Sequence, residues 1–244
     1  MTARNLFRKL FQQPAAPRRA RATALTLGIL EAREVPAAYA FSAGTLTVNM
    51  AEVPNHILFK LEAFSSGVVR VNGADTGSSP ANTVVGAPHG RLLSADVHKI
   101  VVNGSIYDDR IDLSGVDTRG FAGLNGKVEV YGNGGNDRIV GTAFGDQIHG
   151  GSGNDYIDGV GGDDRIWGDD GNDTLYGNQG NDRIDGGAGD DYLNGGDDND
   201  LLVGGAGKDL FDGGPGTDTV WVDAADLGRW YNAEVIRTGT PPQI

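Results

Sequence analysis

Residues 150–158 read GGSGNDYID, and the pattern of this nonapeptide recurs without a change of register from residue 132 to residue 221. Glycine occupies the first position of all ten repeats, aspartate the sixth, and Ile, Leu, Phe or Val the eighth. In order, the repeats are GNGGNDRIV, GTAFGDQIH, GGSGNDYID, GVGGDDRIW, GDDGNDTLY, GNQGNDRID, GGAGDDYLN, GGDDNDLLV, GGAGKDLFD and GGPGTDTVW. A disordered acidic linker would scatter its apolar residues, so this periodicity indicates a repeat fold.

A nine-residue period with one apolar position predicts a short strand and a turn in each repeat. The eighth side chain points inward, its two neighbours point outward, and the preceding six residues reverse the chain. Two repeats then form one coil, and successive coils stack as parallel strands about 4.8 Å apart. Glycine at the first and fourth positions is expected to permit positive φ there. We therefore predict an all-β solenoid in which 18-residue coils stack as parallel strands.

The inward positions of these repeats predict a thin hydrophobic core. Its members are Ile139, Ile148, Ile157, Ile166, Leu175, Ile184, Leu193, Leu202, Phe211 and Val220. One interior side chain contributes about 2 kcal/mol, whereas ordering the nine residues of a repeat costs several times that. Hydrophobic burial alone is therefore not expected to keep the segment folded.

The acidic residues are concentrated in the same segment. Residues 132–221 hold 19 Asp and four Lys or Arg, and the whole chain has a net charge of −13. Stacked coils bring every second sixth-position Asp into line, where unneutralised carboxylates repel each other by about 1 kcal/mol per pair. Such a surface excludes nucleic acid and anionic lipid as partners and favours a cation.

Calcium suits this composition better than other hard cations. It takes six to eight oxygen ligands, which carboxylates and the carbonyls of glycine-rich turns can supply together, whereas magnesium demands a tighter octahedron. The rival EF-hand loop needs a bidentate Glu. Residues 132–221 contain no Glu, so an EF-hand is excluded there.

The repeats GGSGNDYID and GGAGDDYLN resemble the repeat-in-toxin (RTX), or hemolysin-type calcium-binding, nonapeptide G-G-x-G-x-D-x-U-x. The resemblance covers residues 132–221 and extends weakly to 104–112 and 123–131. It implies an exported protein and an all-β, right-handed parallel β-roll that holds several Ca²⁺ ions, each between two turns on the same edge. The implied ligands are the carboxylates of Asp137, Asp146, Asp155, Asp164, Asp173, Asp182, Asp191, Asp200, Asp209 and Asp218, with the turn carbonyls of Gly132, Gly135, Gly150, Gly153, Gly168, Gly171, Gly186, Gly189, Gly204 and Gly207.

Odd-numbered and even-numbered repeats place their turns on opposite edges of the roll. Every odd repeat has Gly at its fourth position, whereas Phe144 and Asp198 replace this glycine in two even repeats. A non-glycine residue at positive φ costs about 1 kcal/mol or more. We therefore expect an unbroken stack of about four calcium sites on the odd edge, since five turns share four gaps, and interruptions at the two outer gaps of the even edge.

The flanking segments are less regular. Residues 1–40 are assigned to a segment outside the fold, either a basic arm or an export signal, because an apolar run at 22–30 precedes a small A-x-A cleavage site formed by Ala38 and Ala40. Residues 41–103 form a β-rich segment of degenerate coils, with strands expected at 44–50, 56–63, 67–73 and 98–104.

Residues 104–221 are assigned to the calcium-binding β-roll, and residues 222–244 to a tail. This tail is either a cap over the open end of the roll or a secretion signal. The cap would be formed by the tail's apolar side chains, Trp230, Tyr231, Val235 and Ile236.

No catalytic motif is present outside the repeats. The chain lacks HExxH, G-x-S-x-G and P-loop patterns, and its histidines, His56, His89, His98 and His149, have no metal-ligand spacing. The repeat explains Asp164 and Asp191, and solvation explains Asp163, Asp190 and Asp158. We therefore expect no enzyme, or the non-catalytic repeat module of an exported hydrolase system.

A binding role is the alternative interpretation. Tyr156, Tyr176 and Tyr192 are expected on one outer face of the roll, and Trp167 and Trp221 on the other. Exposed aromatic rings can contact sugars or a cell-surface partner, as in an adhesin or a polysaccharide-binding module, although they can also shelter a thin roll. The chain has no cysteine, and no apolar run is long enough to span a membrane.

Overall fold

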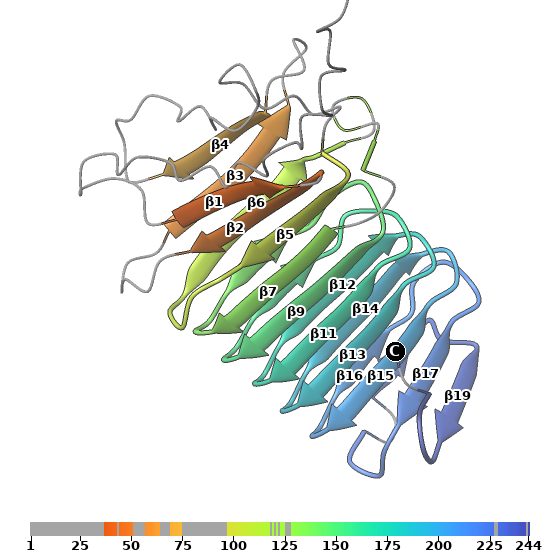
Figure 1. The fold of residues 1–244 in the computed structure, drawn as a ribbon. Helices are drawn as coiled ribbons and strands as arrows, with labels where there is room; N and C mark the ends of the chain where they lie inside the picture. Colours follow the sequence, from red (N-terminus) through yellow and green to blue (C-terminus); the bar gives the residue numbers. More distant parts are fainter. Residues whose placement is uncertain are drawn as a thin grey trace, which may run out of the picture.

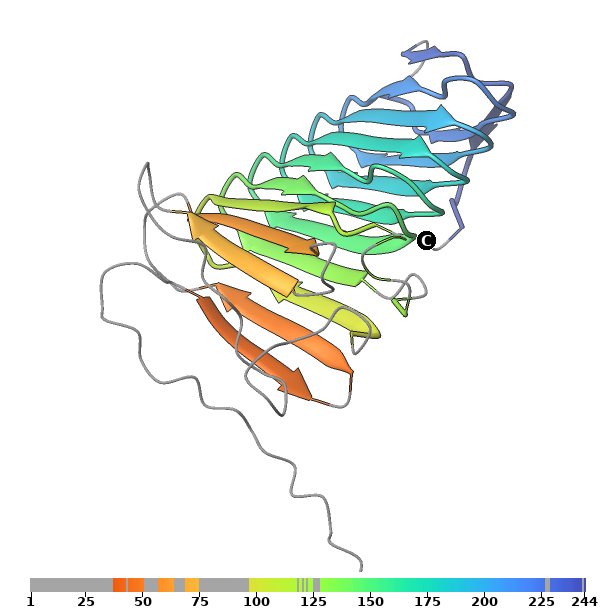
Figure 2. The ribbon, with the colours of Figure 1, turned by 90° about the horizontal axis from the view of Figure 1, so that it is seen from above.

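Two facing sheets of mostly parallel strands make up the described part of the chain (Figure 1). The computed structural model describes residues 37–42, 44–50, 57–63, 69–74, 97–117, 119, 121, 123–124, 128–226, 229–242 and 244. Figure 2 shows the two sheets from above, with the coils following one another along the roll. Over these residues every regular element is a strand, and none is a helix that could cross a membrane.

Sheet A has ten strands and sheet B has nine. In spatial order, sheet A contains β1 (Ala37–Ser42), β2 (Thr45–Met50), β5 (Lys99–Asn103), β7 (Val128–Gly134), β9 (Asp146–Ser152), β11 (Arg165–Asp170), β13 (Arg183–Ala188), β15 (Leu201–Ala206), β17 (Thr219–Val222) and β19 (Val235–Thr238). Sheet B contains β4 (Val69–Ala74), β3 (Ile57–Ala63), β6 (Asp109–Gly115), β8 (Arg138–Val140), β10 (Tyr156–Asp158), β12 (Thr174–Gln179), β14 (Tyr192–Asp197), β16 (Leu210–Asp212) and β18 (Trp230–Tyr231). Only β1–β2 and β3–β4 pair antiparallel among the described strands.

Odd repeats supply the strands of sheet B and even repeats those of sheet A. Ile157 in sheet B pairs with Ile139 and Leu175, so neighbouring strands are one 18-residue coil apart. All ten predicted core residues are fully buried, with 0% exposure. The predicted all-β parallel β-roll is therefore confirmed.

The sheets continue on the N-terminal side of the repeats. β2 and β5 extend sheet A and β3 extends sheet B, all in parallel register. Leu46, Val48, Ile100 and Val102 of β2 and β5 join the core with 0% exposure. Hence the four predicted strands form, and part of the 41–103 segment extends the two sheets of the roll as additional coils.

The N-terminal boundary differs from the predicted one. Residues 37–40, assigned from the sequence to an arm outside the fold, lie in β1 and pair with β2. Ala38 and Ala40, the small residues of the predicted cleavage site, are in backbone register with Asn49 and Thr47 of β2. The rest of the predicted arm or signal, residues 1–36, lies outside the described residues, as do His56 and His89.

The turns use positive φ at the second and fourth positions of the repeat, not at the first. At the fourth position, φ is +127° at Gly153 and +80° at Asp198. At the second position, φ is +111° at Gly151 and +79° at Val160. The expectation of positive φ at the first position is therefore wrong. The first-position glycines instead leave space for the Asp side chains described below.

The C-terminal tail adds one more coil to the roll. Trp230 of β18 pairs with Phe211, and Ile236 of β19 pairs with Val220, so both continue the inward positions. Both side chains pack against the end of the core. Tyr231, expected in the cap, is instead 62% exposed.

Candidate metal centre

The ten predicted aspartates form two straight ladders of hydrogen bonds, one along each edge. On the odd edge, the backbone N–H of Asp137 donates to Oδ1 of Asp155 at 2.7 Å, and that of Asp155 donates to Oδ1 of Asp173 at 2.8 Å. The bonds continue to Asp191 and Asp209. On the even edge, equivalent bonds of 2.8 or 2.9 Å join Asp146, Asp164, Asp182, Asp200 and Asp218. Every one of these side chains is at most 3% exposed.

The second carboxylate oxygen of nearly every ladder residue is buried without a hydrogen-bond partner among the described residues. This holds for Oδ2 of Asp137, Asp155, Asp164, Asp173, Asp182, Asp191, Asp200, Asp209 and Asp218. A buried charged oxygen that lacks a partner destabilises a fold by a few kcal/mol, roughly, unless a proton or a cation compensates it. These oxygens therefore favour either a proton or a bound cation beside them.

Carbonyl oxygens of the glycine-rich turns lie close to these unpaired carboxylate oxygens. A Cβ added to Gly186 would clash with Oδ2 of Asp191 and lie 2.5 Å from the carbonyl oxygen of Gly204 in the next coil. The same arrangement recurs at Gly168 with Asp173. First-position glycine is thus required for space, since two oxygens from adjacent coils converge where a side chain would begin.

Burial raises the pKa of the ladder carboxyl groups above the ordinary value of 3.8. The pKa rises to about 6 for Asp155, Asp173, Asp182 and Asp191, about 7 for Asp146, Asp200 and Asp209, and about 8 for Asp137. For Asp164 the pKa reaches about 10, because the nearby charge of Asp146 adds to the effect of burial. The metal-free ladders therefore favour protonation, which indicates a site built for positive charge.

The donor set fits a hard cation that accepts carbonyl oxygens. No three acidic or histidine side chains converge on one point in the described part of the chain. A bound ion would therefore take most of its ligands from backbone carbonyls, with carboxylates from the ladder. Calcium tolerates such mixed oxygen shells, whereas Zn²⁺ prefers nitrogen and sulfur ligands.

Asp146, at the start of the even ladder, differs from the other nine aspartates. Its Oδ2 accepts the backbone N–H of Thr142 at 2.6 Å, and its Oδ1 accepts the Thr142 hydroxyl at 2.8 Å. Phe144 N–H in turn donates to the Thr142 hydroxyl at 3.0 Å. Both oxygens of Asp146 are thus already bonded within their own turn, which supports the expected interruption at this outer gap.

The other departure from glycine leaves the even ladder intact. Asp198 adopts positive φ in place of glycine, and Asp182, Asp200 and Asp218 remain joined by bonds of 2.8 and 2.9 Å. Aspartate tolerates the left-handed region better than most residues. Calcium occupancy at this gap stays a prediction.

Two residues of the tail complete the ladders and escaped the sequence analysis. Asp209 N–H donates to Oδ1 of Asp226 at 2.8 Å, and Asp218 N–H donates to Oε2 of Glu234 at 2.8 Å. Their separations of 17 and 16 residues break the 18-residue spacing, which hid them. A signal was present, because Glu234 and Ile236 repeat the sixth and eighth positions with Glu in place of Asp.

A further ladder runs along the fifth positions in the opposite direction. Asn181 N–H donates to Oδ1 of Asp163 at 2.9 Å, and Lys208 N–H donates to Oδ1 of Asp190 at 2.9 Å. Asp158 likewise accepts a hydrogen bond of 2.8 Å from the Asn178 side chain. The interpretation of Asp163, Asp190 and Asp158 as merely solvated is therefore wrong, since all three bind the next coil.

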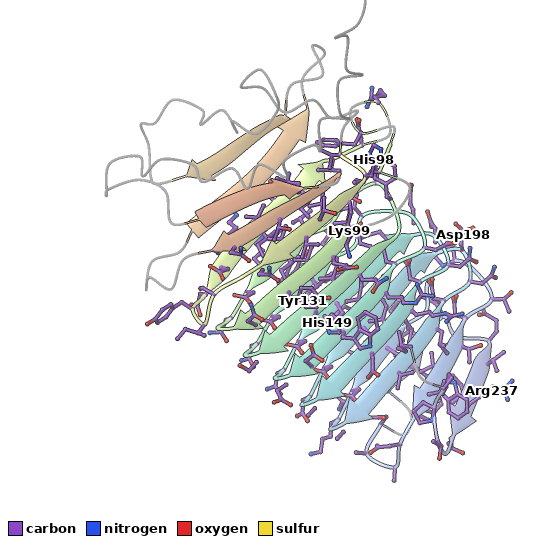
Figure 3. The ribbon with its side chains drawn as sticks, in the orientation of Figure 1. His98, Lys99, Tyr131, His149, Asp198 and Arg237 are labelled. Carbon is purple, nitrogen blue, oxygen red and sulfur yellow. The ribbon has the colours of Figure 1, made fainter. Side chains whose placement is uncertain are left out.

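The histidine inside the repeats, His149, belongs to a stack of aromatic rings on sheet A. The ring of His149 lies 5.4 Å from Tyr131 and 4.3 Å from Trp167 between centroids, and both pairs are stacked. Figure 3 shows Tyr131 and His149 together on the face of sheet A, with Asp198 at the edge formed by the even turns. His149 thus lies on the outer face of sheet A, where it makes ring contacts.

The role of first-position glycine can be tested with two matched alanine substitutions. Gly186→Ala is expected to lower the melting temperature of the calcium-loaded roll by several degrees, since its Cβ would displace Oδ2 of Asp191. Gly161→Ala is the control, because its Cβ would meet only ordinary contacts of 3.7 Å or more. Thermal unfolding followed by circular dichroism measures both. Equal melting temperatures for the two variants would contradict the spatial role of Gly186.

Comparison with known families agrees with this geometry. The family model for the RTX calcium-binding nonapeptide repeat matches four overlapping stretches, residues 131–166, 158–193, 167–202 and 185–220. No curated protein and no solved structure matches the chain. The matched stretches coincide with the coils that carry the unpaired carboxylate oxygens. Residues 131–220 of this chain are therefore RTX calcium-binding nonapeptide repeats, and this segment belongs to that family.

Proposed function

We propose that the protein is a non-catalytic calcium-binding β-roll that reaches its fold when the exported chain meets calcium outside the cell. The observation that carries the proposal is the two rows of buried Oδ2 atoms, nine in all, without hydrogen-bond partners in the described structure. Such a row is costly in a metal-free fold and becomes favourable once a cation compensates it. Several ions are expected, distributed along both edges.

The two oxygens of each ladder carboxylate have separate tasks in this proposal. Oδ1 accepts the backbone N–H of the preceding coil and thereby fixes the orientation of the side chain, as Asp173 does for Asp155. Oδ2 is left for the ion, together with carbonyls such as that of Gly186. Bound calcium supplies the positive charge that these oxygens lack. Because each carboxylate in the interior of a ladder lies between two gaps, filling one gap orders the next.

Folding outside the cell is expected from the calcium affinity that such sites generally have. Extracellular calcium modules commonly bind with dissociation constants of about 10⁻⁴ to 10⁻³ M. At the low calcium concentration inside a cell, the acidic segment would stay expanded by its own repulsion, and export would supply the ion. Folding and export would then be controlled by one switch, whichever signal directs the export.

A calcium titration followed by circular dichroism tests this proposal. The full chain is expected to fold cooperatively with a midpoint of about 10⁻⁴ to 10⁻³ M calcium. Magnesium at the same concentration is the control and should leave the chain unfolded, because it gives up its water ligands reluctantly. A midpoint below about 10⁻⁶ M would contradict folding outside the cell, since sensors inside cells bind in that range.

The raised pKa values predict a dependence on pH in the absence of calcium. The pKa of Asp155 and Asp173 is about 6 in the folded roll, above the ordinary value of 3.8. The folded state thus binds protons more tightly than the unfolded chain, so the stability of the calcium-free roll increases as pH falls through about 6 and decreases as pH rises through it. In chelator, we expect more β-structure by circular dichroism at about pH 5 than at about pH 7.5.

In the presence of calcium, we expect the opposite dependence on pH. Protons compete with calcium for the same carboxylates, so the midpoint of the calcium titration should move to higher calcium concentration as the pH falls. A calcium-free chain that loses structure on acidification would show that the ladder carboxyl groups do not control folding.

A second candidate function, sugar or cell-surface binding, is favoured by a cluster of tyrosines on sheet B. The rings of Tyr156 and Tyr176 are 5.5 Å apart, those of Tyr176 and Tyr192 are 5.8 Å apart, and the guanidinium of Arg138 lies 4.1 Å from the Tyr156 ring centroid. Loss of binding on a glycan array for the Tyr156→Ala, Tyr192→Ala double variant would support it. Trp167→Ala, on sheet A, is the control. The same cluster would serve an adhesin or the repeat module of an exported hydrolase system.

A further inference from the structure

We propose that a groove along sheet B, beside the even turns, binds a neutral oligosaccharide. The groove has a volume of about 730 Å³, and its polar walls are formed by Asp158, Asn178, Asn194, Asp212 and Asn232. This inference rests on the second candidate function and assigns residues to it that lie outside the tyrosine cluster.

The groove exists because side chains are absent from the middle of one row of turn positions. Gly196 and Gly214 occupy second positions of their repeats, with Asn178 on one side of them in this row and Asn232 on the other. Each asparagine donates from Nδ2 to an aspartate of the preceding coil, Asn178 to Asp158 at 2.8 Å and Asn232 to Asp212 at 2.7 Å. The two Asn–Asp pairs form end walls, and the glycines leave the space between them open.

The polar groups of the walls match the hydroxyl groups of a sugar. Each wall presents a carboxylate, which accepts hydrogen bonds, beside an amide, whose oxygen accepts and whose nitrogen donates. Between the walls, Asn194 is half-buried, and its Nδ2 donates to the Tyr192 hydroxyl at a long 3.3 Å. Its amide oxygen has no hydrogen bond to the described residues, so it offers an acceptor to a ligand.

The charge of the groove selects among ligands. Asp158, Asp197 and Asp212 line it, and no Lys or Arg does. Phosphates, nucleic acids and sugars that carry carboxylates would be repelled by these walls. A neutral polyhydroxyl ligand can instead donate its hydroxyl protons to them.

The tyrosine cluster borders the groove and supplies an apolar surface. Tyr176 lies between Asp158 and Asn194 in the register of sheet B, and Asn194 contacts the Tyr192 hydroxyl. An aromatic ring beside a row of hydrogen-bonding groups suits a ligand that has both C–H faces and hydroxyl edges. The volume of 730 Å³ lies within the range of about 300–1,000 Å³ that is typical of ligand sites.

The test measures binding of the calcium-loaded full chain to neutral and anionic oligosaccharides on an array, followed by calorimetry with the neutral sugar that binds best. The Asn194→Ala, Asp212→Ala double variant is expected to bind that sugar at least tenfold more weakly. The control is Asp185→Ala, which removes an aspartate from the equivalent ninth position on sheet A. Unchanged calcium titrations must show that both variants fold.

The outcomes separate this inference from the function on which it rests. If the groove variant binds normally while the Tyr156→Ala, Tyr192→Ala variant does not, sugar binding stands and the groove assignment is overturned. If the protein as it exists binds no sugar, both are overturned. If anionic sugars bind better than neutral ones, the proposed ligand class is wrong. Loss of binding in the groove variant alongside normal binding by Asp185→Ala supports the inference.

Discussion

Removal of calcium with excess chelator at neutral pH is expected to abolish the β-sheet signal of residues 132–221. Without calcium, the folded roll would bury ten aspartates, each at most 3% exposed, and nine of them would have an oxygen without a hydrogen-bond partner in the described structure. Each unpaired buried oxygen opposes folding by about 1–3 kcal/mol or more. A single protein domain is typically stable by only about 5–15 kcal/mol, so this combined penalty exceeds what the narrow core can offset.

Circular dichroism with and without chelator measures this effect, and restoring calcium should recover the signal. The transition should be cooperative, because a carboxylate such as Asp173 faces the gaps on both of its sides. Thermal unfolding in calcium provides the reference for full folding. A β-sheet signal that stays unchanged in chelator at neutral pH would sink the proposal that calcium drives folding.

Substitutions of two ladder aspartates, Asp173 and Asp146, are expected to differ strongly in how much calcium binding they remove. Asp173→Ala is expected to abolish calcium binding in two gaps, because Asp173 lies between Asp155 and Asp191 in the middle of the odd ladder. Asp146→Ala should abolish binding in at most one gap, since Asp146 begins its ladder and both of its oxygens are bonded to Thr142. The odd edge would then be the more important edge for calcium binding.

The number of calcium ions bound per chain, from calorimetry and from elemental analysis, decides between these outcomes. Asp173→Asn is the companion variant if Asp173→Ala fails to fold, because the amide keeps an acceptor for the Asp155 N–H and removes the charge. Equal losses of calcium in Asp173 and Asp146 variants would refute the difference between the edges.

The regular part of the repeat was predictable because stacking converts sequence period directly into position. Ile157 is buried and Asp155 lies on a ladder for the same reason, namely that an 18-residue coil returns each side chain to its place one strand further on. One of the two departures from glycine was also informative, since Phe144 lies in the turn that Thr142 and Asp146 close by their own hydrogen bonds, whereas Asp198 leaves its ladder intact.

Features that depend on contacts between coils were not predictable in the same way. Asp226 and Glu234 complete the two ladders although the tail breaks the nine-residue period, because a carboxylate on a shorter connection reaches the same N–H groups. Asp163 and Asp190 resemble ordinary surface acids in the sequence. Their hydrogen bonds to the next coil arise only once the coils are stacked.

The amino-acid order alone was sufficient for the β-roll, its core positions and the two rows of aspartates, because one short period specifies them all. The three-dimensional structure was needed to show which oxygens of those aspartates remain unpaired. It also showed that first-position glycine avoids a clash with Asp side chains, as at Gly186, and does not serve a positive φ. The reason is physical: a period specifies where residues lie along a coil, whereas hydrogen bonds and close contacts between coils depend on distances that only packing sets.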